Sequence, residues 1–226
     1  ATDHLAVPDA TSLGIVGAGV QSYTQLEAIA EVRDIEEVVV SDLDEERVEA
    51  FVDAFDGRFD VRGGSVAEAG HCDVLSTVTP VEDPIVGPDD VGEHTHINAM
   101  GADAAGKHEL ADELLADAAI VIDDREQCTH SGEINVPYAA GTLTDDDIYG
   151  ELGAIVVGRL AGRVGADGER RGDDGDETSA DDGLTGVTVF DSTGLAIQDV
   201  AAARVVYAQA DDNDNGYPFD LLGLDG

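Results

Sequence analysis

The chain has 226 residues, enough for one large or two small domains, and it carries 50 acidic against 11 basic residues, a net charge of -39. The acids are spread between regularly spaced apolar segments, which excludes disorder throughout, and no basic face is available for nucleic acid. Ten of the 11 basic residues are arginine and Asp outnumbers Glu. This composition predicts a halophilic protein, whose self-repulsion is screened by salt.

Membrane and metal chemistry find little support in the sequence. No apolar run approaches membrane-spanning length and no signal peptide is visible, so a cytoplasmic chain is expected. Cys72 is expected in the core, and Cys128 in a polar loop without a base to activate it. His94 and His96 alternate onto one strand face but lack a third ligand, so no metal site is expected.

The segment S-L-G-I-V-G-A-G-V-Q-S near the N-terminus predicts a strand, a glycine turn and a helix. Leu13–Gly17 is a buried apolar strand, and Val20–Val32 has helical spacing. Gly17 permits the tight turn, Gly19 lets a pyrophosphate approach the backbone, and Ser22 is small enough for helix packing. This G-x-G-x-x-S pattern predicts a dinucleotide site.

An acid follows the next predicted strand, Glu36–Ser41. Asp42 stands on the order of 20 residues after the turn, where a carboxylate binds ribose hydroxyls and repels a 2′-phosphate. We therefore expect NAD rather than NADP. Asp44 is the expected N-cap of a helix over Glu45–Phe55.

Strands and helices continue to alternate after this point. A short strand is expected at Arg58–Arg62, a helical turn with a capping box at Ser65–Ala69, and a strand at Asp73–Val78. Ligands bind at the carboxyl ends of strands in open α/β sheets. Thr77 or Thr79 is therefore expected to contact a cofactor.

The next expected strand is His96–Met100, and the loop that follows it holds the strongest catalytic candidate. Asp103 lies between Gly and Ala residues, and a carboxylate there can take or give a proton beside a nicotinamide. Lys107 is the chain's single lysine, which indicates contact with the cofactor or stabilisation of Asp103. A turn aspartate and a helix-start lysine remain alternatives.

The remaining elements complete an α/β pattern. They are a helix at Glu109–Ala116, a strand at Ala119–Asp123, an amphipathic helix at Ile148–Ala161, a strand at Gly186–Phe190 and a helix at Ala196–Ala210. The pattern predicts a Rossmann-type, doubly wound parallel sheet, with remnants of a second domain at the termini.

Composition also suggests where the chain divides. Residues 1–11 are expected to end a truncated N-terminal domain, 12–163 to form the NAD-binding domain, and 164–183 to be an acidic surface insertion. Residues 184–210 would supply the last strand and helix, and 211–226 a tail. In the loop after that strand, Asp191 or Ser192 can cap the helix, or Ser192 and Thr193 can face the nicotinamide.

Together these motifs resemble the ornithine cyclodeaminase/mu-crystallin family, and within it the archaeal alanine dehydrogenase branch. The likeness covers most of residues 1–210 and is carried by six blocks: Gly17–Ala28, Val38–Asp44, Cys72–Pro80, His96–Leu110, Ser131–Val136 and Val189–Asp199.

The resemblance implies an NAD-dependent enzyme that passes hydride between an amino-acid Cα and the nicotinamide through an imino acid. It implies a small amino or keto acid substrate and a homodimer for the full-length protein. Asp103 matches the proton-handling residue, and Thr193 would border the substrate. The matching cofactor positions are Gly17, Gly19, Val20, Gln21, Asp42, Thr77, Asn98, Met100, Lys107 and Ser192.

One departure bears on activity. The family binds the substrate carboxylate through basic residues that precede the dinucleotide domain, and this chain is expected to start after that region and to lack most of the substrate pocket. The wording F-D-S-T-G-L-A-I-Q-D favours alanine dehydrogenase. Ornithine cyclodeaminase, a non-catalytic NAD(P)H-binding protein like mu-crystallin, and an incomplete product that folds poorly are the alternatives.

Overall fold

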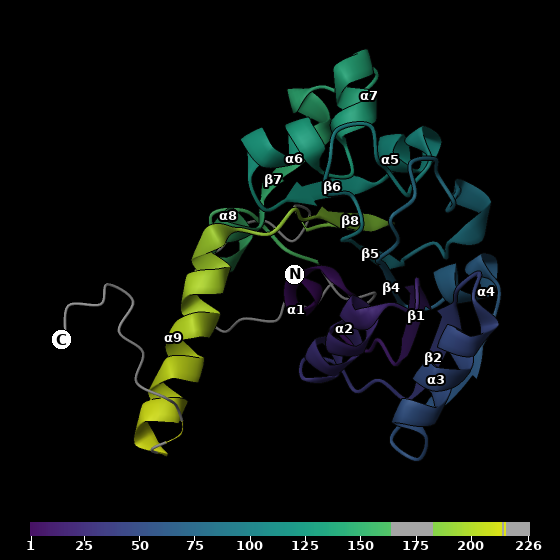
Figure 1. Cartoon of the computed structure of the whole chain (residues 1–226). Coiled ribbons are helices and arrows are strands. Elements are labelled where there is room, and N and C mark those ends of the chain that lie inside the picture. Colours follow the sequence, from purple (N-terminus) through teal and green to yellow (C-terminus); the bar gives the residue numbers. More distant parts are fainter. Residues whose placement is uncertain (164–182, 214, 216–226) are drawn as a thin grey trace. The chain divides into compact units, whose positions relative to one another are not determined.

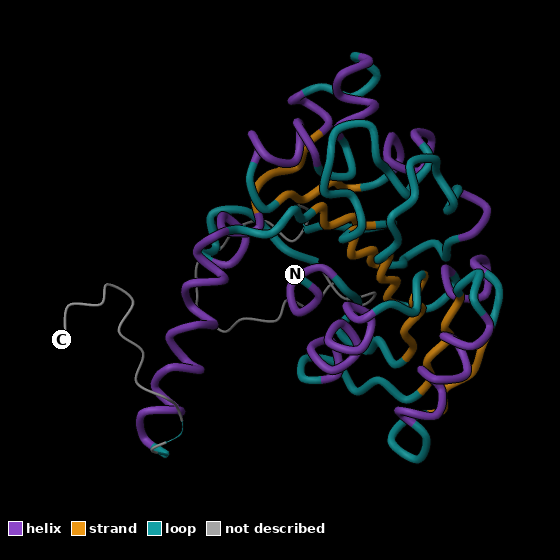
Figure 2. Tube along the Cα trace, in the orientation of Figure 1, coloured by secondary structure: helices purple, strands orange, loops and turns teal. Residues whose placement is uncertain are grey.

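A parallel sheet of eight strands organises the chain, whose computed structural model describes residues 1–163, 183–213 and 215 (Figures 1 and 2). The strand order is β3-β2-β1-β4-β5-β8-β6-β7, so the direction of winding reverses between β1 and β4. This confirms the predicted doubly wound α/β fold. The strands are β1 (Ser12–Val16), β2 (Glu37–Ser41), β3 (Asp60–Gly63), β4 (Val74–Thr77), β5 (His96–Ala99), β6 (Ala119–Ile122), β7 (Ile148–Glu151) and β8 (Thr188–Asp191).

Helices cover both faces of this sheet. Alternate strand residues explain this, because Ile15 packs with α2 and α3 on one face, while Val16 belongs to the apolar cluster on the other. That second cluster includes residues of α4, α5 and α6, and α1 and α8 pack near β6 and β8 on the first face. The helices are α1 (Thr2–Leu5), α2 (Val20–Ala30), α3 (Glu45–Phe55), α4 (Val66–Gly70), α5 (Asp112–Asp117), α6 (Arg125–Ser131), α7 (Asn135–Ala140) and α8 (Leu152–Val156), with 3-10 turns η1 (Pro88–Asp90) and η2 (Asp145–Asp147).

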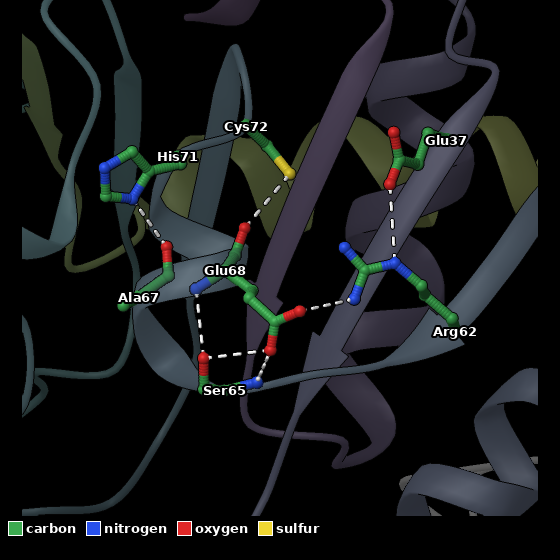
Figure 3. Close-up of polar contacts among 7 residues, drawn as sticks. All are labelled: Glu37, Arg62, Ser65, Ala67, Glu68, His71 and Cys72. Carbon is green, nitrogen blue, oxygen red and sulfur yellow. Dashed lines mark hydrogen bonds and ion pairs between the residues drawn. The ribbon is translucent and has the colours of Figure 1, made fainter.

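The predicted capping box is present at the start of α4 (Figure 3). The Ser65 hydroxyl accepts from the Glu68 N–H at 3.2 Å, and the Glu68 carboxylate accepts from the Ser65 N–H at 2.9 Å. The same carboxylate pairs with Arg62 at 2.9 Å, and Arg62 lies 3.5 Å from Glu37 of β2. The cap therefore also ties α4 to β2 and β3.

The expected long helix at Ile148–Ala161 is wrong. Residues 148–151 form β7, which pairs with β6, and only Leu152–Val156 are helical. Glycines explain the break: Gly150 has φ +158° and Gly158 has φ +72°, and neither conformation continues a helix. The prediction that Cys128 lies in a polar loop is also wrong, because this residue is inside α6 and fully buried.

The chain divides into two compact units, residues 1–193 and 194–226. The second contains α9 (Ala196–Asp212), which confirms the predicted last helix and extends it by two residues into the expected tail. All but the last residue of the expected acidic insertion lies outside the described residues, so the domain boundaries stay predictions. Within the described part of the chain, no helix is both long and apolar enough to cross a membrane.

Candidate functional site

The glycine turn follows β1 at the point where the winding reverses. Gly17 has φ +102°, and a Cβ there would lie 2.8 Å from the Val78 carbonyl oxygen and 2.9 Å from Thr79 Cγ2. Gly19 is different, because a Cβ would meet nothing within 4 Å. Ser22 is buried and donates to the Gly19 carbonyl at 2.5 Å. The turn thus packs tightly against the residues that follow β4 and leaves open space beside Gly19.

The start of α2 carries no negative charge. Its N-cap is Gly19, no side chain caps it, and its first turn has no acidic residue. By contrast, α3 has Asp44 as a cap and two glutamates in its first turn. Val20 is 88% exposed and Gln21 is exposed as well. In so acidic a chain, this leaves the positive end of one helix dipole available to an anion.

Asp42 lies beside this turn, as its position after β2 predicted. Its Oδ2 accepts from the Ala18 N–H at 2.7 Å, and its Oδ1 accepts from the Asp44 N–H at 2.9 Å. Each carboxylate oxygen can accept a further bond. Asp42 therefore fixes the glycine turn, and its oxygens can accept further hydrogen bonds.

Glu109 connects the ends of β4 and β5. Its Oε1 accepts from the Thr79 N–H at 2.7 Å and from the Thr79 hydroxyl at 2.6 Å, and its Oε2 accepts from the Gly101 N–H at 3.0 Å. A Cβ on Gly101 would collide with this carboxylate. Since Thr79 also packs against Gly17, the loop that carries Asp103 is joined to the glycine turn through Thr79 and Glu109.

Two more buried acids extend this chain of contacts. Glu133 Oε1 accepts from the N–H groups of Glu109 at 2.7 Å and Leu110 at 2.6 Å. The Asp191 carboxylate accepts from the N–H groups of Glu133 at 2.9 Å and Ile134 at 3.2 Å. Burial raises the pKa of Glu109, raises that of Glu133 well above its ordinary value, and raises that of Asp191 to about 7. These acids hold a proton more readily than ordinary carboxyls do.

Asp103 and Lys107 form an ion pair, with Lys107 Nζ 2.8 Å from Asp103 Oδ1. The Asp103 side chain is 72% exposed and that of Lys107 is 26% exposed. The hydrogen bond and charge of Lys107 lower the pKa of Asp103. Asp103 is therefore an exposed carboxylate that stays ionised at neutral pH.

Ser192 and Thr193 are held at the end of β6. The Ser192 hydroxyl and the Thr193 N–H donate to Asp123 Oδ2 at 2.8 and 3.0 Å. Met100 follows β5, with its N–H on the Thr77 carbonyl, and Thr77 is the buried last residue of β4. The roles of these residues in binding stay predictions.

Asn98 lies inside β5 among buried polar groups. Its amide donates to the Thr2 hydroxyl at 3.1 Å, and its Oδ1 lies 3.2 Å from His96 Nε2. His94 and His96 do not share a strand face, because β5 begins at His96, which is buried, and His94 is exposed. Among the described residues, no group of three or more His, Cys, Asp or Glu side chains is placed to hold a metal ion.

Glu109, Glu133 and Asn135 are not predicted by any motif to hold the loops of this edge, and Asp191 is predicted only as a helix cap. The segment S-G-E-I-N-V contains two of them, but no spacing rule marked it as a helix start. In a chain with 50 acids, a buried carboxylate is not distinguishable by composition from a solvated one.

The fold and the glycine turn at the reversal of winding place this chain in the Rossmann class. The family model described as "Ornithine cyclodeaminase/mu-crystallin family" matches residues 1–169 and 174–214. The chain belongs to this family, as its motifs predicted.

Three proteins within the family are similar to this chain over most of its length. Alanine dehydrogenase of Archaeoglobus fulgidus is 42% identical over 93% of this chain and 60% of its own length. A solved archaeal alanine dehydrogenase dimer with bound NAD has a TM-score of 0.86 at 39% identity, covering 98% of this chain and 64% of that one. The Delta(1)-pyrroline-2-carboxylate reductase of Thermococcus litoralis, solved with NADH and L-proline, has a TM-score of 0.84 at 30% identity, covering 97% and 64%. The chain thus spans less than two thirds of the length of these relatives.

Proposed function

We propose that the carboxyl edge of β1, β2, β4 and β5 binds NAD. The open space above Gly19, the uncapped start of α2 and the free acceptors of Asp42 fit a pyrophosphate and an adenosine ribose. The negative charge of Asp42 disfavours a 2′-phosphate, which supports NAD over NADP. When bound, NADH would supply the hydride.

We further propose that the whole protein is an amino-acid dehydrogenase, with alanine dehydrogenase as the best-supported activity. The reaction is pyruvate, ammonium, NADH and a proton giving alanine, NAD⁺ and water. Its support is the likeness to the Archaeoglobus enzyme and the geometry that joins the Asp103 loop to the glycine turn through Glu109. That connection is the observation that carries the proposal.

In this reaction Asp103 moves protons. Two protons must pass from the ammonium nitrogen to the keto oxygen before the carbon can be reduced as a protonated imine. As a carboxylate, Asp103 accepts the first when the nitrogen is freed to attack the keto carbon and the second from the resulting adduct. It passes each proton to the oxygen, which becomes a hydroxyl and then leaves as water. Lys107 keeps Asp103 ionised between these steps, because its positive charge lowers the pKa of that carboxyl.

A second candidate is reduction of a preformed cyclic imine. The likeness to the Thermococcus reductase, whose structure holds NADH and L-proline, supports it. Ornithine cyclodeamination, which yields proline and ammonia, uses the same hydride and proton steps in another order. The three activities differ in the nitrogen source, so they can be separated by substrate.

The test is an NADH oxidation assay of the full-length gene product in molar KCl. We would offer pyruvate with ammonium, Delta(1)-pyrroline-2-carboxylate, and, with NAD⁺, ornithine while proline is measured. Turnover with pyruvate that falls by about 10²-fold or more in Asp103→Ala supports the proposal. Asp117→Ala, which removes another exposed acid, at the end of α5, is the control and should stay active.

Other outcomes would reassign the protein. Turnover confined to the cyclic imine or to ornithine would make it a reductase or a cyclodeaminase. Tight NADH binding without turnover of any of the three would indicate a binding protein. Absence of NADH binding would contradict the proposal at its first step.

A further inference from the structure

We propose that Asn135, to which the sequence assigned no role of its own, is a positioning residue that holds Lys107 against Asp103. This inference rests on the proposed function, because it assigns Asp103 the proton-transfer role. Asn135 touches neither carboxylate nor ammonium. It acts on the backbone that carries them.

The loop between β5 and α5 is anchored at both ends. At its start, the Gly101 N–H donates to Glu109 at 3.0 Å. At its end, Asn135 Oδ1 accepts from the Gly106 N–H at 2.8 Å, and Asn135 Nδ2 donates to the Lys107 carbonyl at 2.7 Å. Residues 103–106 between the anchors are exposed. The conformation of this exposed stretch is therefore set by the two buried anchors.

The second anchor is itself firmly held. Asn135 is 4% exposed and is the first residue of α7. Its Nδ2 also donates to the Gly132 carbonyl at 2.6 Å, so both amide hydrogens and the amide oxygen are used. The two residues before it, Glu133 and Ile134, are bound through their N–H groups to Asp191 of β8. Asn135 thus fixes the loop to the sheet.

The chemistry at this position requires an amide. One atom must accept from Gly106 and another must donate to two carbonyl oxygens, which neither a carboxylate nor a hydroxyl can do. Gly106 has φ +92°, a conformation that favours glycine, and the asparagine binds the N–H of Gly106 and the carbonyl of the next residue, Lys107.

The Asp103–Lys107 pair needs this support. An ion pair this exposed contributes little by itself, because water screens it and two flexible side chains must be ordered. With the Lys107 backbone fixed by Asn135, the ammonium is kept within 2.8 Å of Asp103 Oδ1. Loss of the anchor should therefore release the lysine and leave the aspartate without its partner.

The single lysine allows a direct test that needs no cofactor. With lysine labelled by ¹³C and ¹⁵N, the chain gives one set of side-chain NMR signals, from Lys107. In the wild type these signals should shift as Asp103 titrates, at a pH below the usual aspartate range, since Lys107 lowers the pKa of Asp103. In Asn135→Ala the inflection should move up toward the ordinary value or disappear.

Kinetics provide the second readout, in the full-length gene product. Asn135→Ala should lower kcat about tenfold to a hundredfold, while KM for NADH changes about threefold at most, because misplacement affects the chemical step. Asn135→Gln keeps the donor and the acceptor on a longer side chain, so its kcat should lie between those of the wild type and of Asn135→Ala. This variant provides the test if Asn135→Ala does not fold. Thr142→Val, which removes a bond to the Pro137 carbonyl in the same helix, should leave the titration and kcat unchanged.

Two results would overturn the inference. One is a Lys107 titration in Asn135→Ala and Asn135→Gln that matches the wild type. The other is a fall in kcat in Thr142→Val as large as in the Asn135 variants, which would show a general effect of α7 stability. If the wild type turns over none of the substrates, the proposed function fails, but the NMR titration still decides whether Asn135 holds the pair.

Discussion

In the parallel sheet, the amino ends of the strands form one edge (the amino edge) and their carboxyl ends form the other (the carboxyl edge). Buried side chains of opposite charge stabilise these two edges. At the amino edge, the buried guanidinium groups of Arg33 and Arg163 donate to carbonyl oxygens. At the carboxyl edge, Glu109, Glu133 and Asp191 accept from backbone N–H groups. The same sheet thus buries cations at one edge and carboxylates at the other.

The polarity of the backbone explains this difference. In a parallel α/β fold, the carboxyl ends of strands lead toward helix starts with free N–H groups, and the amino ends follow helix ends with free carbonyls. Asp73 is an exception at the amino edge, where it accepts from the N–H groups of Thr11 and Ser12. The carboxyl edge, which holds the candidate site, is thus also the edge where burial raises the pKa values of buried acids, that of Asp191 to about 7.

The largest effect is expected at the amino edge, from Arg33→Met. The guanidinium donates to five carbonyl oxygens, those of Thr2, Asp3, Ala6, Val7 and Val32. Their loss should lower the free energy of unfolding by about 3 kcal/mol, without changing kcat below the melting temperature. Denaturant unfolding in molar KCl measures this, with Arg47→Met as the exposed control at under about 1 kcal/mol. Equal losses in the two variants would contradict the comparison.

The pH dependence of stability should have opposite signs at the two edges. Burial lowers the pKa of His96, at the amino end of β5, to about 3, so its contribution makes the free energy of unfolding rise with pH between about 3 and 6.5. For Asp191, with a pKa of about 7, the folded chain keeps a proton that the unfolded chain loses above about 4, so this contribution falls as pH rises to 7.

Two variants separate these contributions. Asp191→Asn removes the titrating carboxyl whose contribution to the free energy of unfolding falls with rising pH. The slope of this free energy against pH should therefore increase by about 1.4 kcal/mol per pH unit between pH 5 and 7. His96→Gln should change the slope in the opposite direction below pH 6.5. Unfolding free energies measured at several pH values decide this, and curves parallel to that of the wild type would mean that neither group is buried in the state assumed.

A smaller effect is expected from Asp42→Asn, which tests whether an acid at the carboxyl edge serves a ligand as well as the backbone. KM for NADH should rise about tenfold, and the preference for NADH over NADPH should shrink, because the repulsion of a 2′-phosphate is lost. Asp44→Asn keeps a helix cap and should leave both quantities unchanged. Unaltered discrimination in Asp42→Asn would argue for a structural role alone.

The smallest effect is expected from thiol reagents. Cys72 and Cys128 are buried, burial raises the pKa of Cys72 to about 11, and the pKa of Cys128 is raised further by burial and by Asp191. Neither thiol should react with an aromatic disulfide reagent until the chain unfolds. Absorbance of the released thiolate, with and without denaturant, measures this, and rapid labelling of the native chain at Cys128 would show that the carboxyl edge opens.

The sequence by itself predicts the features that are built from neighbouring residues. The glycine turn, the capping box at the start of α4 and the Asp103–Lys107 loop each involve residues within about one helical turn of each other, and Asp42 is found because it ends the strand that follows the first strand and helix. The alternation of apolar runs likewise predicted the parallel sheet. Such features can be recognised in a single sequence because a local turn or cap restricts which residue types can stand at neighbouring positions.

Only the tertiary structure decided what joins these parts. It inserted β8 between β5 and β6, made β7 a strand, and formed α6 and α7 where no helix was expected. It also selected Glu109, Glu133 and Asn135, from among many polar residues, to hold the loops at the carboxyl edge. Their partners lie up to 58 positions away. Which polar side chains meet across such separations depends on tertiary packing, which composition and apolar periodicity do not encode.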